Sequence, residues 1–295
     1  VVCHSAWAQI IFGPVVTAAR LPLALWLHGP VDSGHWLLRL AKRVPPDIAL
    51  CNSRFTASTL SALYPRVRGE VVHCPVDLSA AGLGEGERAG IRAELHTPED
   101  AVVIIQASRM EALKGHAVLL RVLGDLRDLP GWVCWIVGGA QRPEEVRYLA
   151  GIEQLAAELG IMHRLRFAGQ RSDVPRLLDA ADIHCQPNTG PDAFGIAFVE
   201  ALRAGLPCVT TALGGAPEVV DARCGILVPP GDPAALATAL HGLIVDEALR
   251  RRLGAAGPAR ARKLCDPSEQ IPRLYHLLAG LRREPSVAPI GRAAR

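Results

Sequence analysis

Short runs of apolar, often β-branched residues alternate with longer amphipathic stretches along almost the whole chain. This alternation is typical of β-α-β units, in which helices join parallel strands. We expect strands over residues 1–4, 21–27, 47–51, 70–74, 101–108, 132–139, 164–169, 182–187, 207–211 and 225–230. We expect helices up to about residue 20, over 34–43, from 53, from 115, over 143–159, ending near 181, and over about 195–204, followed by two closing helices.

One stretch interrupts the alternation. Residues 79–90 are rich in Ala and Gly and have no strand pattern, so they are the best candidate for a linker. We therefore predict an α/β chain of two Rossmann-like, doubly wound parallel-sheet domains, over residues 1–78 and 79–281. The last helix of the second domain can pack back on the first, and residues 282–295 form a basic flexible tail.

Composition narrows the class of protein. In 295 residues, an apolar fraction of 49%, a mean hydropathy of +0.21 and a charged fraction of 21% describe a folded chain. The formal net charge is only +3, and the last fourteen residues carry four arginines against one glutamate, so the remaining body is neutral. A neutral body excludes nucleic acid as the main partner. The tail has two interpretations, a loose solvated end, which is the commoner case, or a peripheral contact with an anionic membrane surface.

The cysteines and the apolar runs indicate the cellular compartment in which the protein is expected. The eight cysteines are widely spaced, form no C-x-x-C pair and lie mostly in predicted strands, which suits reduced thiols better than disulfides or a zinc site. No run of eighteen apolar residues occurs, because Gln9, the Gly13–Pro14 pair and Arg20 interrupt residues 6–27. The chain begins at Val1 without a basic leader. We therefore expect no signal peptide and a cytoplasmic protein with at most peripheral contact to the inner face of the membrane.

The loop after the strand at 101–108 is the first candidate for chemistry. Arg109 and Lys114 lie five residues apart, and Gly115 stands at a helix start, so the loop can surround an anion together with helix N–H groups. Only three of the 32 cationic residues are lysines, which favours a specific use for Lys114 as a compact charge. The alternative is that both cations are ordinary solvated charges near a helix start.

The second candidate covers residues 187–209. Asp192 lies in a loop and Glu200 in the following helix, with Phe194 and Gly195 at the turn between them. Two carboxylates so placed can bind hydroxyl groups of a polar ligand, while N–H groups near Gly195 face a negative group. Asp192 can alternatively cap the helix, and Glu200, among apolar neighbours, needs a partner if it is buried.

The two candidate segments belong to a series of seven motifs. In chain order these motifs are SRMEALKG, WVCWIVGG, RLRFAGQ, LLDAADIHCQPN, DAFGIAFVEALRAGLPCVTT, GGAPEVV and GILVPPGD. The chain thereby resembles the retaining glycosyltransferases of family 4, which have the GT-B fold. The similarity runs from about residue 1 to 278 and is most specific over 108–233. It implies two Rossmann-like domains, of which the N-terminal, acceptor-side one is incomplete here, and a C-terminal domain that binds a nucleotide-diphosphate sugar.

The resemblance also implies residue roles. Arg109 and Lys114 match positions that neutralise the diphosphate, and Glu200 matches the position that holds the ribose hydroxyls. The turn over Ala193, Phe194, Gly195 and Ile196 presents backbone N–H groups to the donor. Family members usually carry Glu at the place of Asp192, where it contacts the donor sugar. Because Asp is one methylene shorter, its reach to a sugar hydroxyl, and with it the donor preference, stays open.

On the N-terminal side, PLALWLHG resembles a family strand that ends in a His facing the cleft, here His28. Such a His can orient or polarise the reacting sugar, although a loop His near a helix start is an alternative. Gly138 and Gly139 are expected in a tight turn. Gly214, Gly215 and Glu218 are expected to shape a loop and a helix start beside the pocket, and Gln170 and Arg171 either flank the base or lie in a surface loop.

The expected chemistry follows from charge development. Breaking the bond between the anomeric carbon and the diphosphate puts negative charge on the leaving group, which Arg109 and Lys114 would stabilise in the transition state. We expect no metal or other cofactor, because the chain has no D-x-D element at a strand end. Retention follows from the resemblance alone. The expected partners are a nucleotide-diphosphate sugar and a saccharide, lipid-linked or small-molecule acceptor. A non-catalytic nucleotide-sugar-binding fragment is the first alternative. Another GT-B enzyme, such as a nucleotide-sugar epimerase or a sugar phosphorylase, is the second; the phosphorylase is disfavoured, because only Lys114 in these motifs could hold a pyridoxal cofactor.

Overall fold

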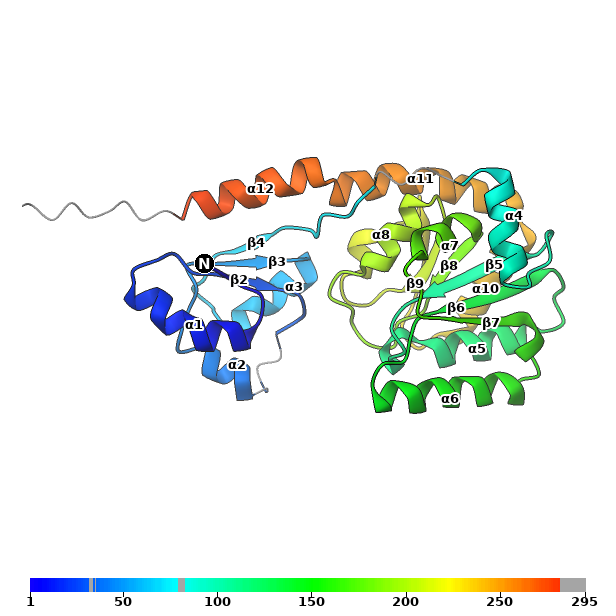
Figure 1. Cartoon of the computed structure of the whole chain (residues 1–295), viewed down its shortest axis with the longest axis horizontal. Helices are drawn as coiled ribbons and strands as arrows, with labels where there is room; N and C mark the ends of the chain where they lie inside the picture. The colour runs from blue at the N-terminus through cyan, green and yellow to red at the C-terminus, as the bar shows by residue number, and fades with distance from the viewer. Residues whose placement is uncertain (32–33, 35, 79–82, 282–295) are drawn as a thin grey trace, which may run out of the picture.

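The computed structural model describes residues 1–31, 34, 36–78 and 83–281. It contains two parallel sheets, one of four strands and one of six (Figure 1). The strands are β1 Val2–Cys3, β2 Ala24–Leu27, β3 Ile48–Cys51, β4 Gly69–Val71, β5 Val102–Ala107, β6 Trp132–Val137, β7 Leu165–Gly169, β8 Ile183–Gln186, β9 Cys208–Thr211 and β10 Gly225–Val228. The predicted α/β class, with a GT-B-like pair of parallel sheets, is confirmed.

The helices lie between these strands and after the last one. They are α1 Ala6–Ala18, α2 Trp36–Ala41, α3 Arg54–Thr59, α4 Glu85–Glu94, α5 His116–Asp125, α6 Pro143–Glu158, α7 Val174–Ala180, α8 Ile196–Arg203, α9 Ala216–Val219, α10 Pro233–Val245, α11 Glu247–Cys265 and α12 Pro267–Ala279. Strands β2, β3, β6, β8 and β9 are short segments buried along their whole length, as is typical of the central strands of parallel sheets, whereas β4, β7 and β10 are partly exposed.

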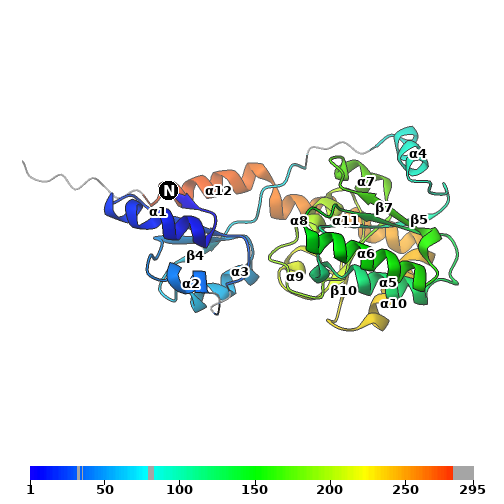
Figure 2. The same ribbon diagram turned by 60° about the horizontal axis from the view of Figure 1, so that its bottom comes forward.

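The six-stranded sheet has the order β10-β9-β8-β5-β6-β7, with Ile104 opposite Ile183 and Val102 opposite Trp132. Helices cover both of its faces and enclose a core on each side. Figure 2 shows α5, α6 and α10 together on the face turned toward the viewer. The chain leaves β5 in one direction toward β6 and β7 and in the other toward β8, β9 and β10. This reversal of strand order is the place where doubly wound sheets bind ligands.

The four-stranded sheet has the simple order β1-β2-β3-β4, with Ala24 opposite Ile48. Buried residues of one face pack against partly buried residues from α1, α2 and α3. On the other face, Leu274, Leu277 and Leu278 of α12 pack against a cluster that includes Trp26 and Leu50. The C-terminal helix therefore returns to the first sheet, as Figure 1 shows.

Two expectations about helices were wrong. The linker expected over 79–90 is shorter than predicted, because α4 begins at Glu85; residues 79–82 lie outside the described residues. Tertiary contacts stabilise α4, since Arg88 and Arg92 each lie 2.7 Å from a carboxylate oxygen of Asp182. The chain was also expected to close with two helices, but the described part closes with three. Asp246 and Asp266, whose carboxylates accept backbone N–H groups, begin α11 and α12.

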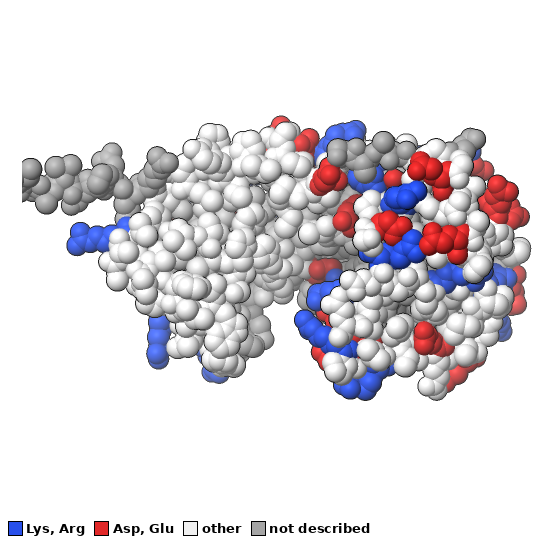
Figure 3. Space-filling view, in the orientation of Figure 1, with Lys and Arg blue, Asp and Glu red and all other residues white. Residues whose placement is uncertain are grey.

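The remaining expectations concern thiols, membranes and charge. All eight cysteines are free, and all but Cys74 are buried. Within the described residues, no helix has the length and apolarity needed to cross a membrane. On the face in Figure 3, lysines, arginines and acids gather over the six-stranded sheet and are sparse over the four-stranded one. The basic tail expected over 282–295 lies outside the described residues.

Candidate functional site

Two adjoining hollows lie at the carboxyl ends of the strands, the first at β5 and β8, where the strand order reverses, and the second at β5, β6 and β7. The first, of about 420 Å³, is lined from the six-stranded side by Ser108, Arg109, Lys114, Gln186, Asp192 and the turn after it, and from the four-stranded side by His28, Asn52 and Cys74. The second, of about 370 Å³, is lined by Ser108, Arg109, Gly138, Gly139, Gln141, Gln170, Arg171 and Glu200, among others. The two hollows share Ala107, Ser108 and Arg109, so they lie side by side, and together they extend from Glu200 to His28; we call the pair the groove.

The loop from β5 to α5 brings both predicted cations to this groove. Lys114 Nζ lies 2.6 Å from Asp192 Oδ2, and the two side chains are only 12% and 19% exposed. Arg109 is 65% exposed and lies 2.7 Å from Glu111 Oε1. Each cation has an acid beside it, but only Lys114 is mostly buried, while Arg109 stays largely exposed to solvent.

Close approach of the backbone shapes this loop. Gly115 has a φ of +78°, and a Cβ there would lie 1.8 Å from the Pro187 carbonyl oxygen. Only Gly combines this left-handed conformation with so short a distance to the segment after β8. Lys114 is thereby held against the loop that carries Asp192.

Buried polar side chains anchor the same loop. Gln106 Nε2 donates to the Lys114 carbonyl oxygen at 2.8 Å, and Ser108 Oγ lies 3.1 Å from His116 Nε2. Burial lowers the pKa of His116 to about 4, so its ring is neutral near pH 7. Sequence reasoning did not single out Gln106 or His116, since buried polar side chains resemble core positions until their partners are known.

The turn before α8 has the form that a ligand-facing backbone needs. Gly195 has a φ of +89° and precedes the first residue of α8, and Asp192 caps nothing there. The capping alternative for Asp192 is therefore wrong; its carboxylate bonds Lys114 instead. Phe194 is buried and its ring stacks on His73, with centroids 4.9 Å apart. Ala193, Phe194, Gly195 and Ile196 all line the first hollow.

Glu200 lies in α8 and faces the second hollow beside Gly138, Gly139 and Gln170. Burial raises the pKa of its carboxyl group, and nearby Arg203 opposes that shift. Among the described residues, no hydrogen bond or ion pair engages the Glu200 carboxylate. A half-buried carboxylate that faces a hollow without a protein partner is suited to accept hydroxyl groups of a ligand.

The four-stranded sheet contributes His28, which directly follows β2. His4 Nδ1, just after β1, lies 3.0 Å from His28 Nε2, and both rings stack near Trp26. Burial lowers the pKa of His28, and His4 lowers it further. Sequence reasoning left His4 and Asn52 out of the site. The available signal was that His4 ends one predicted strand and Asn52 directly follows another.

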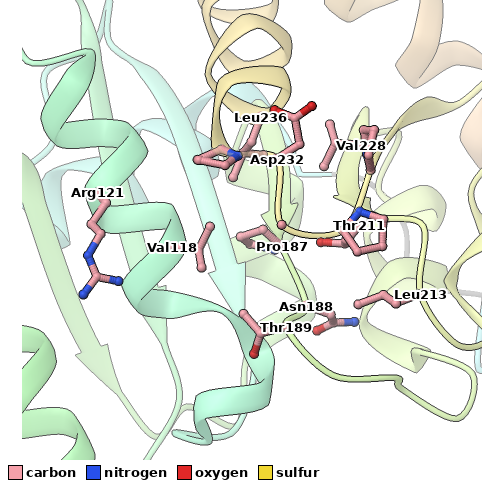
Figure 4. Close-up of a pocket in the computed structure, with 14 residues that line it drawn as sticks. Val118, Arg121, Pro187, Asn188, Thr189, Thr211, Leu213, Val228, Asp232 and Leu236 are labelled. Atoms are coloured by element: carbon pink, nitrogen blue, oxygen red, sulfur yellow. The ribbon is translucent and has the colours of Figure 1, made fainter.

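A third hollow, of about 360 Å³, lies between α5, α10 and the ends of β8, β9 and β10 (Figure 4). Its walls are mainly Val, Leu and Pro side chains, and Arg121 extends away from the other labelled residues. None of the predicted site residues lines it. In addition, no group of three or more His, Cys, Asp or Glu residues in the described ranges could hold a metal ion.

Comparison with known proteins adds a family match. The model of the family described as "Glycosyl transferases group 1" matches residues 87–260, more than half of the chain. A D-inositol 3-phosphate glycosyltransferase of Streptomyces avermitilis is 35% identical over 231 residues, which are 73% of this chain and 48% of that protein. A phosphatidyl-myo-inositol mannosyltransferase of Mycobacterium leprae is 36% identical over 174 residues, 57% of this chain and 44% of that protein. The chain spans about half the length of these curated relatives.

Among solved structures, Anabaena Alr3699/HepE in complex with UDP-glucose superposes with a TM-score of 0.85 at 25% identity. The match covers 95% of this chain and 78% of that one. A sucrose-phosphate synthase from Thermosynechococcus elongatus, at 23% identity and a TM-score of 0.79, supports the fold alone.

Proposed function

The chain belongs to the group 1 glycosyl transferases, and from this premise we propose that it transfers a sugar, with retention, from a nucleotide-diphosphate sugar to an acceptor. The observation that carries the proposal is the groove at the ends of β5 and β8, in which Lys114, Arg109 and Glu200 line adjoining hollows. Two cations in one hollow and one carboxylate in the adjoining hollow suit the diphosphate and the ribose of one donor molecule.

We assign the groups to parts of the donor. Arg109, Lys114 and the backbone N–H groups of residues 193–196 bind the diphosphate, and Glu200 accepts the ribose hydroxyls. The nucleoside lies beside Gly138 and Gly139. Asp192 contacts the donor sugar and shares Lys114 with the diphosphate. The complex of Anabaena Alr3699/HepE with UDP-glucose supports uridine as the first nucleotide to test.

Catalysis in this proposal is mainly electrostatic. As the anomeric bond breaks, charge on the leaving diphosphate grows, and the fixed cations stabilise that charge more than they stabilise the ground state. His28 faces the first hollow from the opposite sheet and orients the reacting sugar through a ring nitrogen. Its lowered pKa keeps the imidazole neutral, so it acts as a hydrogen-bonding group rather than as a charge. No step requires a metal ion.

The proposal for the acceptor is less specific than the proposal for the donor. Two relatives are named for D-inositol 3-phosphate and phosphatidyl-myo-inositol, a small polar and a lipid-linked molecule. We therefore propose a saccharide, lipid-linked or small-molecule acceptor bound on the His28 side of the groove. A lipid-linked acceptor would be reached by peripheral contact with the inner face of the membrane.

A nucleotide panel tests the donor site. UDP, GDP and ADP are compared as thermal stabilisers of the full chain, and release of free nucleotide is then measured with the matching sugar donors. We expect one diphosphate to raise the melting temperature, and Lys114→Ala and Glu200→Gln to reduce the shift strongly at the same nucleotide concentration. Lys263→Ala, which removes an exposed lysine of α11, is the matched control and should behave like the parent chain.

The outcomes separate the alternatives. Stabilisation by none of the diphosphates contradicts the donor site itself. Binding without nucleotide release, with every acceptor class present, favours the non-catalytic nucleotide-sugar-binding alternative. Release that is unaffected by EDTA supports metal-free transfer, and the anomeric configuration of the product, read by NMR, tests retention.

A further inference from the structure

Glu218 reaches from the six-stranded unit to the four-stranded one. Its Oε2 accepts the backbone N–H of Arg54 at 2.8 Å and its Oε1 accepts that of Phe55 at 2.7 Å, although the residues are more than 160 positions apart. The Glu218 side chain is only 16% exposed. We propose that Glu218 is a positioning residue, whose carboxylate holds α3 against the donor side and so sets the distance across the groove. Its consequence for catalysis rests on the function proposed above.

The N-terminus of α3 is suited to accept a carboxylate as a hydrogen-bond partner. Arg54 and Phe55 are the first two residues of α3, and the first N–H groups of a helix have no acceptor within it. Ser53 already uses its hydroxyl oxygen to accept the Thr56 N–H at 2.9 Å. The two N–H groups that Ser53 leaves free are those that Glu218 accepts. A negative charge at this end of a helix also has a favourable interaction with the helix dipole.

Several backbone contacts hold the segment around Glu218 in place. Arg260 of α11 donates to the carbonyl oxygens of Glu218 and Val219 at 2.6 and 3.0 Å. Just before α9, the Gly215 N–H donates to the Asp192 carbonyl oxygen at 2.8 Å, and a Cβ on Gly215 would lie 2.3 Å from the Ala193 carbonyl oxygen. The segment that carries Glu218 is therefore packed directly on the donor-facing turn.

The residue just before α3 forms part of the wall of the groove. Asn52 comes just before α3 and lines the first hollow together with His28, opposite Asp192. Its Oδ1 accepts the Thr56 hydroxyl at 2.8 Å, so Asn52 moves with α3. His73, which follows β4, also lies close to this carboxylate, with its Nε2 3.9 Å from Glu218 Oε2. Other polar contacts between the described parts of the two units lie along the crossover and the last helices, such as Val76 to the Cys265 carbonyl oxygen. Glu218 instead acts beside the groove, where a small rotation changes the distance between His28 and the donor.

Hydrogen exchange on the full chain reads the contact directly. We compare Glu218→Ala and the nearly isosteric Glu218→Gln with the parent and with Glu247→Ala, which removes an exposed first-turn glutamate of α11. In Glu218→Ala the amides of Arg54 and Phe55 should exchange about tenfold faster or more, because both acceptors are lost. Glu218→Gln keeps one oxygen and should show a smaller loss. Amides of β6 should be unchanged, which separates local release from unfolding.

Scattering and kinetics then test the consequence. Small-angle scattering should give a larger radius of gyration for Glu218→Ala, and donor turnover should lose kcat at least about fivefold while UDP affinity stays within about twofold. Unchanged exchange at Arg54 and Phe55 in both Glu218 variants overturns the proposal, as does faster exchange with unchanged scattering and kcat. Failure of the parent chain to bind any diphosphate instead overturns the proposed function, and the exchange and scattering results still decide whether Glu218 holds α3.

Discussion

The ion pair between Lys114 and Asp192 predicts opposite effects of two alanine variants on nucleotide binding. The two charged atoms lie 2.6 Å apart in side chains that are mostly buried. At the effective dielectric constant of about 20 that suits such sites, unit charges about 4 Å apart interact by about 4 kcal/mol. A diphosphate must therefore share the Lys114 ammonium with Asp192 and also tolerate the carboxylate beside it.

Lys114→Ala removes the attraction and leaves the carboxylate, so UDP affinity should fall by about 2 kcal/mol, or roughly thirtyfold. Asp192→Ala removes the competitor and leaves Lys114 free, so affinity for UDP alone should rise about threefold to tenfold. Affinity for the sugar nucleotide should rise less or fall, because the proposed contact of Asp192 with the sugar is lost. The double variant should bind UDP better than Lys114→Ala, because it also lacks the carboxylate that repels the diphosphate, but less well than Asp192→Ala, because it lacks the ammonium.

Titration calorimetry with UDP at two salt concentrations measures all four chains. Salt should weaken binding to Asp192→Ala more than to Lys114→Ala, because the former keeps an uncompensated cation. Urea unfolding of each chain checks that the fold remains; each single variant should lose about 1 to 3 kcal/mol, between the values for exposed and fully buried pairs. If Asp192→Ala weakened UDP binding as much as Lys114→Ala, the pair would act as one structural unit, and the reasoning from competition would be wrong.

Three further predictions concern stability. Glu200→Gln should raise the free energy of unfolding at pH 7 by about 1 kcal/mol while weakening UDP binding, because burial raises the pKa of Glu200 and the ionised form costs stability above its usual pKa; urea unfolding at pH 7 and at a pH below the usual pKa of Glu, about 4, should show the difference shrink at the lower pH, and a constant difference would contradict this. Gly115→Ala should cost more than about 3 kcal/mol, whereas Gly131→Ala, at nearly the same φ but with nothing within 4 Å, should cost about 1 kcal/mol; equal melting temperatures would refute the clash. Burial lowers the pKa values of His116 and His184 to about 4, so below pH 6.5 the unfolded chain takes up protons that the folded chain does not; the free energy of unfolding should therefore fall by up to about 3 kcal/mol for each histidine as pH falls from 6.5 to 4, and urea midpoints that stay constant over this window would exclude this.

Local patterns were enough to predict most of the strands. The run at 132–139 became β6, and that at 101–108 became β5, because a short apolar segment between turn residues has few other stable states than a buried parallel strand. The helix α4 was missed for the opposite reason. Its ten residues carry few apolar side chains, and ion pairs to Asp182, about ninety residues away, stabilise it.

The candidate site could be predicted in its residue types more than in its contacts. Gly at a helix start, a lysine in a chain that mostly uses arginine, and two acids with seven residues between them are local signals, and they led to Lys114, Asp192 and Glu200. That Lys114 bonds Asp192, and that Arg109 instead lies beside Glu111, was not predicted. Nor was the approach of His4 to His28.

By itself, the sequence determined the alternation of strands and helices, the positions that need glycine and the kinds of group available for chemistry, because periodicity and backbone preferences act over a few residues. Only the tertiary structure decided which groups meet. Lys114 reaches Asp192, and Glu218 reaches α3, because sheet order, strand register and the return of α12 bring distant segments together. Such contacts depend on how whole elements pack against one another, and no local pattern encodes that packing.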